Sequence, residues 1–176
     1  HSIKVNRWEH PKGIDWVDSR QWVTIHNTSN ESLNLLRPEM LIPTLETLRR
    51  NVSRKQEDLR LFEFGKSYAQ ENEMPRETEY LVITMSGQQQ PAHWQGGASQ
   101  PIDFFTLKAL VHSLLLRLGI KGWKAESITN SNGIDWGMKY SIGELVFLRC
   151  GKVSGVLSTS FDIRQDVFVA EFPLET

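Results

Sequence analysis

The triplet Gly65-Lys66-Ser67 has the residue types best suited to phosphate chemistry in this chain. A Gly-Lys-Ser sequence ends the loop that cradles nucleotide phosphates in many NTPases, where backbone N–H groups and the Lys ammonium contact phosphate oxygens. That loop also requires a glycine five residues before Gly65, and Arg60 occupies this position. It further requires a helix after the serine, whereas this triplet closes a predicted strand and precedes a polar stretch. A structural role for the triplet is therefore favoured.

A second group of candidates is basic and lies near the end of a predicted helix. It consists of Arg49, Arg50, Arg54 and Lys55. Cations at a helix C-terminus interact favourably with the helix dipole, and a solvated helix end is the favoured interpretation. The alternative is a contact with the phosphates of an RNA or with acidic residues of a partner chain.

The histidines and the cysteine form no catalytic or metal-binding pattern. No two of the five histidines are four residues apart, as a helical metal site would need. His112 lies beside the apolar face of a predicted helix, where packing is favoured over ligation. The single Cys150 excludes an internal disulfide and a cysteine-based metal cluster, and is expected to be a small buried apolar group. No catalytic, cofactor-binding or metal-binding residue is predicted.

The composition places the chain among ordinary globular domains. Its 176 residues can bury a sizeable core, and 39% of them are hydrophobic and 23% charged. A net charge of −1 gives no global attraction to nucleic acid or acidic membranes. There is no apolar run of the roughly 18 residues that a membrane span needs, and the N-terminus lacks an apolar signal core. A reducing, cytoplasmic location is expected, with no membrane association.

Hydrophobic periodicity and turn residues predict the elements of the first two thirds of the chain. Pro43 suits the first turn of a helix that ends near Ser53. Asp103 is a good N-cap for a helix through Leu118, with Gly119 placed to end it. The apolar face of this helix is expected to contain Phe104, Leu107, Val111, Leu114, Leu115 and Leu118. Strands are expected at 21–26, 59–64 and 80–85, and loops at 27–30, 69–79 and 86–101.

The last third is predicted to be mainly β. Strands are expected at 145–150, 153–157 and 167–172, with a tight turn at Gly151-Lys152. Together these elements predict an α+β fold, in which helices flank an antiparallel β-sheet.

The order of several short motifs reveals a resemblance to a known family. An apolar stretch with an arginine at 33–37 precedes the leucine-rich helix, a basic turn, and the strand Leu59-Arg60-Leu61-Phe62-Glu63-Phe64. Further along come Asp103-Phe104-Phe105-Thr106-Leu107-Lys108 and Val167-Phe168-Val169-Ala170-Glu171. Each motif alone is weak, but their order and spacing are specific. Over residues 21–173 the chain resembles the class II synthetase-like module of the β subunit of bacterial phenylalanyl-tRNA synthetase.

Two departures from the family pattern stand out. Family members have a His-Pro and a short helix after the return strand, and Ser158-Thr159-Ser160 takes that place here. The first class II motif is not visible. Residues 1–20 are accordingly interpreted as an N-terminal boundary segment and residues 21–176 as the core module.

The resemblance implies a class II synthetase fold without its catalytic residues. In class II enzymes an arginine after the second-motif strand clamps the α-phosphate, and a third-motif arginine contacts the γ-phosphate. The strand corresponds to residues 59–68, and Ala69-Gln70 stands where the first arginine is expected. No G-x-G-x-x-R sequence occurs. Since each such guanidinium contributes on the order of 3 kcal/mol to the transition state, this chain is not expected to adenylate an amino acid.

The resemblance also implies partners. The module would pack against the catalytic α subunit in an (αβ)₂ ligase that charges tRNA with phenylalanine, with ATP and magnesium bound by the α subunit and tRNA by the whole assembly. The basic cluster would then face tRNA or the α subunit, and the isolated fragment would be free to self-associate. Two alternatives stay open, a free-standing RNA-binding module and a class II-like adenylating paralogue.

Overall fold

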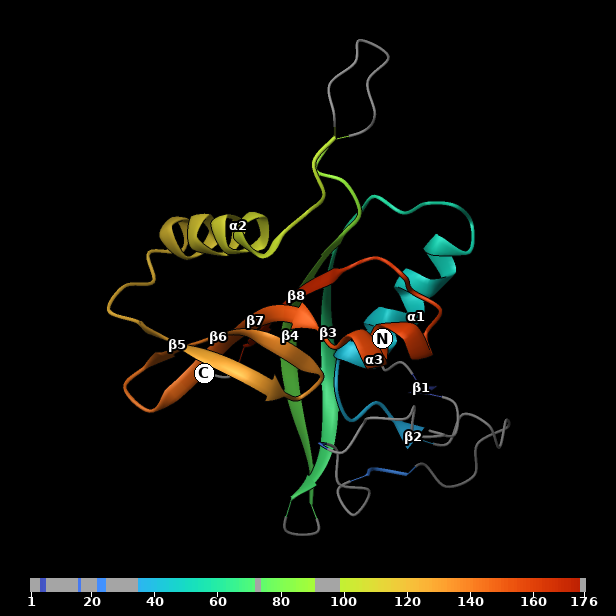
Figure 1. The fold of residues 1–176 in the computed structure, drawn as a ribbon. Helices are drawn as coiled ribbons and strands as arrows, with labels where there is room; N and C mark the ends of the chain where they lie inside the picture. Colours follow the sequence, from blue (N-terminus) through green and yellow to red (C-terminus); the bar gives the residue numbers. More distant parts are fainter. Residues whose placement is uncertain are drawn as a thin grey trace.

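The computed structural model describes residues 4–5, 16, 22–24, 35–71, 74–90 and 99–174. Its centre is a six-stranded antiparallel sheet with the order β3-β4-β8-β7-β6-β5 (Figure 1). The strands are β3 (Leu59–Glu71), β4 (Met74–Ser86), β5 (Lys124–Ser131), β6 (Ile134–Ile142), β7 (Leu145–Val153) and β8 (Val167–Pro173). A two-stranded ladder of β1 (Lys4–Val5) and β2 (Leu35–Leu36) accompanies it.

Helices cover the two faces of the sheet and create two cores (Figure 1). On one face, α1 (Leu41–Val52) and α3 (Gly155–Ser160) pack with residues such as Val82, Val153 and Val169. On the other face, α2 (Phe104–Arg117) packs with Ile83, Ala170 and their neighbours. Because successive strand residues point to opposite faces, β4 and β8 supply both cores. The predicted α+β architecture is confirmed.

Both predicted helices are present. α1 begins two residues before Pro43, which lies in its first turn. At the start of α2, the Asp103 carboxylate accepts a hydrogen bond from the Thr106 backbone N–H at 2.8 Å, and Gly119 ends the helix with φ of 70°. Within the predicted apolar face, Leu118 is the exception because it is exposed beyond the last turn.

The expectation of a loop at 69–79 is wrong. The strand predicted at 59–64 continues to Glu71, and its partner begins at Met74, so the two form one long hairpin. Pro75 had suggested a loop, but it lies where β4 pairs only with β3. One side of the strand is therefore free of ladder partners there, and a residue without an N–H is tolerated.

The chain between 120 and 160 also differs from expectation. The hairpin of β5 and β6 was not predicted, although Asn132-Gly133 is a strong hairpin signal and both residues have positive φ, as a type I′ turn requires. β7 runs straight through the predicted turn at Gly151-Lys152. A Cβ on Gly151 would lie 2.4 Å from the Trp136 carbonyl oxygen, so this glycine permits close approach of two strands.

The strand expected at 153–157 is wrong, because β7 ends at Val153 and Gly155–Ser160 form the short helix α3. This helix includes Ser158-Thr159-Ser160, which replace the His-Pro of the family pattern. The expected strand at 21–26 is described only at 22–24, where Thr24 makes a single bridge to Leu35, and the rest lies outside the described residues, as does the loop at 27–30. Among the described helices, none is long and apolar enough to cross a membrane.

Candidate functional site

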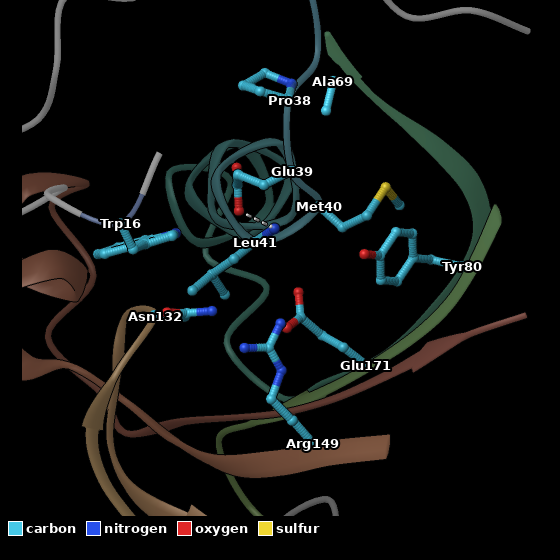
Figure 2. A pocket seen from close by; sticks show the side chains of 10 residues that line it. All are labelled: Trp16, Pro38, Glu39, Met40, Leu41, Ala69, Tyr80, Asn132, Arg149 and Glu171. Atoms are coloured by element: carbon cyan, nitrogen blue, oxygen red, sulfur yellow. Dashed lines mark hydrogen bonds between the residues drawn. The ribbon is translucent and has the colours of Figure 1, made fainter. Parts of the chain in front are cut away.

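A polar cavity of about 170 Å³ lies on the α1 face of the sheet, beside the start of α1 (Figure 2). Four strands contribute a residue each, namely Ala69 from β3, Tyr80 from β4, Arg149 from β7 and Glu171 from β8. The remaining lining residues are Trp16, Pro38, Glu39, Met40, Leu41 and Asn132. The apolar core between α1 and the sheet lies on this same face, next to the cavity.

Glu171 is the central charged residue of the cavity. It lies in the middle of the sheet, paired with Val82 of β4 on one side and Arg149 of β7 on the other. Its exposed fraction is 7%, and burial raises the pKa of its carboxyl, while the charge of Arg149 lowers it. Figure 2 shows the charged ends of Arg149 and Glu171 turned toward each other. Among the described residues, Glu171 makes no hydrogen bond and no ion pair within 4.0 Å.

Glu39 places a second carboxylate at the cavity, and it also caps α1. Its two oxygens accept hydrogen bonds from the backbone N–H groups of Leu41 at 2.6 Å and Ile42 at 2.9 Å. Burial raises the pKa of Glu39 to about 8, the charge of Glu171 acts in the same direction, and the two backbone hydrogen bonds oppose them. The N-cap residue Met40 has no side-chain cap, so Glu39 satisfies two of the helix's unpaired N–H groups.

Arg37 fixes the segment that carries Glu39. It is 1% exposed, and its Nε donates to the Lys66 carbonyl oxygen at 2.6 Å while Nη1 donates to Glu63 Oε1 at 2.8 Å. The Tyr68 backbone N–H donates to the Arg37 carbonyl oxygen at 2.9 Å. A Cβ on Gly65 would lie 2.1 Å from Arg37 Nη2, so glycine is needed where the guanidinium crosses β3. The arginine in the apolar 33–37 stretch is therefore a buried anchor.

The phosphate-loop interpretation of Gly65-Lys66-Ser67 is excluded by its surroundings, because the triplet lies in the middle of β3. Lys66 pairs with Glu77 and, at 3.1 Å, with Glu79 on the neighbouring strand. Hydrogen bonds to these two carboxylates raise the pKa of Lys66. The structural role favoured from the sequence is confirmed.

The predicted basic cluster lies at the other end of α1 from the cavity. Arg49, Arg50, Arg54 and Lys55 are all exposed, and Arg49 pairs with Asp162 after α3 at 3.5 Å. A helix of this length separates its ends by about 18 Å, so the cluster and the cavity are distinct regions. Sequence reasoning did not identify the cavity, whose charged residues are spread over three segments far apart in the chain.

The other candidates are structural in the described part of the chain. His112 lies within 3.0 Å of the Tyr140 hydroxyl and against the Trp123 ring, and burial lowers its pKa. Cys150 is fully buried, which raises the pKa of its thiol to about 11. Within the described residues, no group of three or more His, Cys, Asp or Glu side chains could hold a metal ion.

The charges of the cavity are unfavourable for a triphosphate. Two carboxylates and one guanidinium line it, so its net charge is −1 when both carboxyls are ionised. Ala69, which stands where a class II enzyme is expected to carry a phosphate-clamping arginine, lines the cavity with a methyl group. Phosphate recognition relies on paired or bidentate guanidiniums, and the described lining residues provide one, opposite a buried carboxylate.

The fold defines a class of protein, the class II aminoacyl-tRNA synthetase-like modules. The structure superimposes on Desulfitobacterium hafniense PylSc, a pyrrolysyl-tRNA synthetase, with a TM-score of 0.62 at 21% sequence identity, covering 88% of this chain and 51% of that one. At this identity the likeness establishes the fold alone.

The particular family follows from the sequence comparison. Residues 8–174 match the model described as phenylalanyl-tRNA synthetase beta chain CLM domain, and the chain belongs to this family. It is 32% identical over 165 residues to the phenylalanine–tRNA ligase beta subunit of Porphyromonas gingivalis, covering 85% of this chain and 19% of that protein. It is 26% identical over 176 residues to the Thermotoga maritima beta subunit, covering 99% of this chain and 21% of that protein. The chain thus spans about a fifth of these relatives.

Proposed function

We propose that this chain is the non-catalytic module of a phenylalanine–tRNA ligase β subunit and packs against the catalytic α subunit. Family membership supports the assignment to the ligase. The cavity supports the absence of catalysis, because Ala69 and two carboxylates occupy the region where a nucleotide-binding site would need guanidiniums. The residues that line the cavity do not fit ATP and magnesium, so we assign both to the α subunit. The assembled enzyme is cytoplasmic, and tRNA is bound by the whole assembly.

An exposed aromatic pair on β3 supports a docking role. Phe62 and Phe64 are 72% and 68% exposed on the sheet face that also carries α2, and their rings meet edge to face with centroids 6.3 Å apart. Phe105, Leu110 and Leu116 on the outer side of α2 are also exposed. Such large apolar side chains are stabilised when a partner removes them from water, by about 2 kcal/mol each. We assign this face to the α-subunit interface.

The test is co-purification of the α subunit with a full-length β subunit that contains this module. The double variant Phe62→Ser, Phe64→Ser is expected to weaken association at least tenfold, which corresponds to about 1.4 kcal/mol. Its fold should be retained because both rings lie in solvent. A matched control is Leu145→Ser, which alters an exposed apolar residue at the β6–β7 turn. Association unchanged by the double variant and by deletion of the whole module would refute the docking role.

The basic cluster is a second candidate contact, with tRNA or with acidic residues of the α subunit. The observation in its favour is that Arg50, Arg54 and Lys55 are exposed and make no ion pair with the described residues. Exposed cations that have no partner in their own chain are available to phosphate oxygens or carboxylates of another molecule.

A further inference from the structure

Glu171 is a buried carboxylate that has no hydrogen-bond partner in the described part of the chain. Its exposed fraction is 7%, and it is directed into the cavity beside α1 (Figure 2). Buried polar groups in folded proteins are nearly always paired, since an unpaired one loses its hydration without compensation. The cross-strand neighbour Arg149 interacts with it electrostatically, but their nitrogen and oxygen atoms are more than 4.0 Å apart. A ligand that donates hydrogen bonds would therefore find an acceptor in the Glu171 carboxylate, which faces the cavity.

The surroundings of Glu171 favour a cation over an anion. Glu39 faces the same cavity, its oxygens are directed by the Leu41 and Ile42 N–H groups, and it adds a second negative charge above its pKa of about 8. Arg149 supplies one positive charge, and Tyr80 and Asn132 are neutral. With both carboxyls ionised, a ligand with one positive charge neutralises the lining, whereas an anion would meet two carboxylates at close range.

The size of the cavity limits the ligand to a few heavy atoms. Its volume of about 170 Å³ is close to that of engineered cavities that hold one small ligand such as benzene. A hydrated metal ion is not favoured, because no cluster of three acidic or imidazole ligands exists among the described residues. An ammonium group offers three N–H donors at one end of a small molecule. These donors can bind the Glu171 carboxylate, which has no hydrogen-bond partner among the described residues.

We propose that the cavity between the start of α1 and strands β4, β7 and β8 binds a small primary alkylammonium compound through the Glu171 carboxylate. The ammonium group donates to Glu171, Glu39 adds a favourable field, and the short alkyl part lies against Met40 and Tyr80. The site stands apart from the basic cluster and from the exposed Phe62–Phe64 pair. It therefore does not depend on the proposed docking function, and either can fail without the other.

The test is an NMR titration of the isotope-labelled chain with ethylammonium chloride at about pH 8.5, where the ligand stays charged and the pH is above the pKa of about 8 of Glu39. Saturable shifts with a dissociation constant of roughly 10 mM or tighter are expected at the amides of Leu41, Ala69 and Asn132. Sodium propionate at equal ionic strength should leave these amides unchanged.

Variants make the assignment specific. Glu171→Gln keeps the shape of the side chain and should weaken ethylammonium binding at least tenfold. Glu144→Gln, at the exposed β6–β7 turn, removes the same charge far from the cavity and should bind as the unaltered chain does. Absence of saturable shifts in the unaltered chain, equal shifts with propionate, or undiminished binding by Glu171→Gln would each overturn the proposal. The first of these results needs no variant and identifies a cavity filled only by water.

Discussion

At the scale of single residues, buried charge determines what this module can bind. Arg37 donates to Glu63 and to the Lys66 carbonyl, and these bonds fix the 35–39 segment beside β3. Glu171 is buried with only the electrostatic influence of Arg149, and burial raises its pKa. A paired buried charge fixes the backbone around it, whereas an unpaired one costs stability whenever it is ionised. The two residues thus differ in role although both are charged and buried.

The pKa of Glu171 leads to a prediction about stability and pH. A carboxyl whose folded pKa lies above its unfolded value contributes stability below the unfolded pKa and loses it as pH rises through the folded pKa. Glu171→Gln removes this loss, so the variant should melt at a higher temperature than the unaltered chain at pH 8 and at nearly the same temperature at pH 4.

Thermal unfolding by circular dichroism at several pH values measures this difference, with Glu144→Gln as the control. The difference in melting temperature between Glu171→Gln and the unaltered chain should increase steadily from pH 4 to pH 8. A Glu171→Gln variant that is less stable at pH 8 than the unaltered chain would mean that the electrostatic attraction of Arg149 outweighs the burial of the carboxylate.

At the scale of elements, local signals predicted the helices well and the sheet less completely. Asp103 and Gly119 mark the two ends of α2 because capping is a local interaction that the sequence displays directly. The limits of β3 and β4 could not be found in this way, because pairing across the hairpin extends them into polar residues that look like a loop. The turn predicted at Gly151 was wrong for a similar reason. This glycine allows a close approach to Gly137 and Trp136 on the neighbouring strand, which the local sequence does not reveal.

The candidate sites also differ in whether local sequence or contacts between distant segments form them. The basic cluster is contiguous and was visible in the sequence. The cavity joins Glu39, just before α1, to Arg149 and Glu171, which come more than a hundred residues later in the chain. Arg149 and Glu171 meet because β7 and β8 are neighbours in the sheet. The strand expected at 167–172 contains Glu171, and the sequence of this strand does not reveal that Arg149 and Glu39 lie near that glutamate.

The exposed end of α1 gives a prediction at this scale. If the cluster contacts tRNA, the double variant Arg50→Glu, Arg54→Glu should weaken tRNA binding by the assembled ligase. It should also reduce the slope of log affinity against log salt by about one to two units, because fewer counterions are released. Filter binding at several salt concentrations measures both quantities. The control variant Lys121→Glu, Lys124→Glu makes the same change in charge between α2 and the start of β5. An equal loss of tRNA affinity in this control would mean that net charge alone causes the effect.

At the scale of the whole molecule, the chain combines a class II synthetase-like antiparallel sheet with a polar cavity on its α1 face. Ala69, Arg149 and two carboxyl groups are among the residues that line this cavity. What the fold presents outward is an apolar face on β3 and α2, and this division between interior and surface is the basis of the proposed docking role.

The measurement that tests this account most directly is ATP–pyrophosphate exchange by the purified chain, with phenylalanine and then with a mixture of amino acids. The account predicts exchange no faster than that of an enzyme-free blank, since the phosphate-clamping guanidiniums are missing. Exchange that depends on an amino acid, rises in proportion to the concentration of this chain, and disappears in Arg149→Ala would contradict it. In that case the cavity beside α1 would be a working active site.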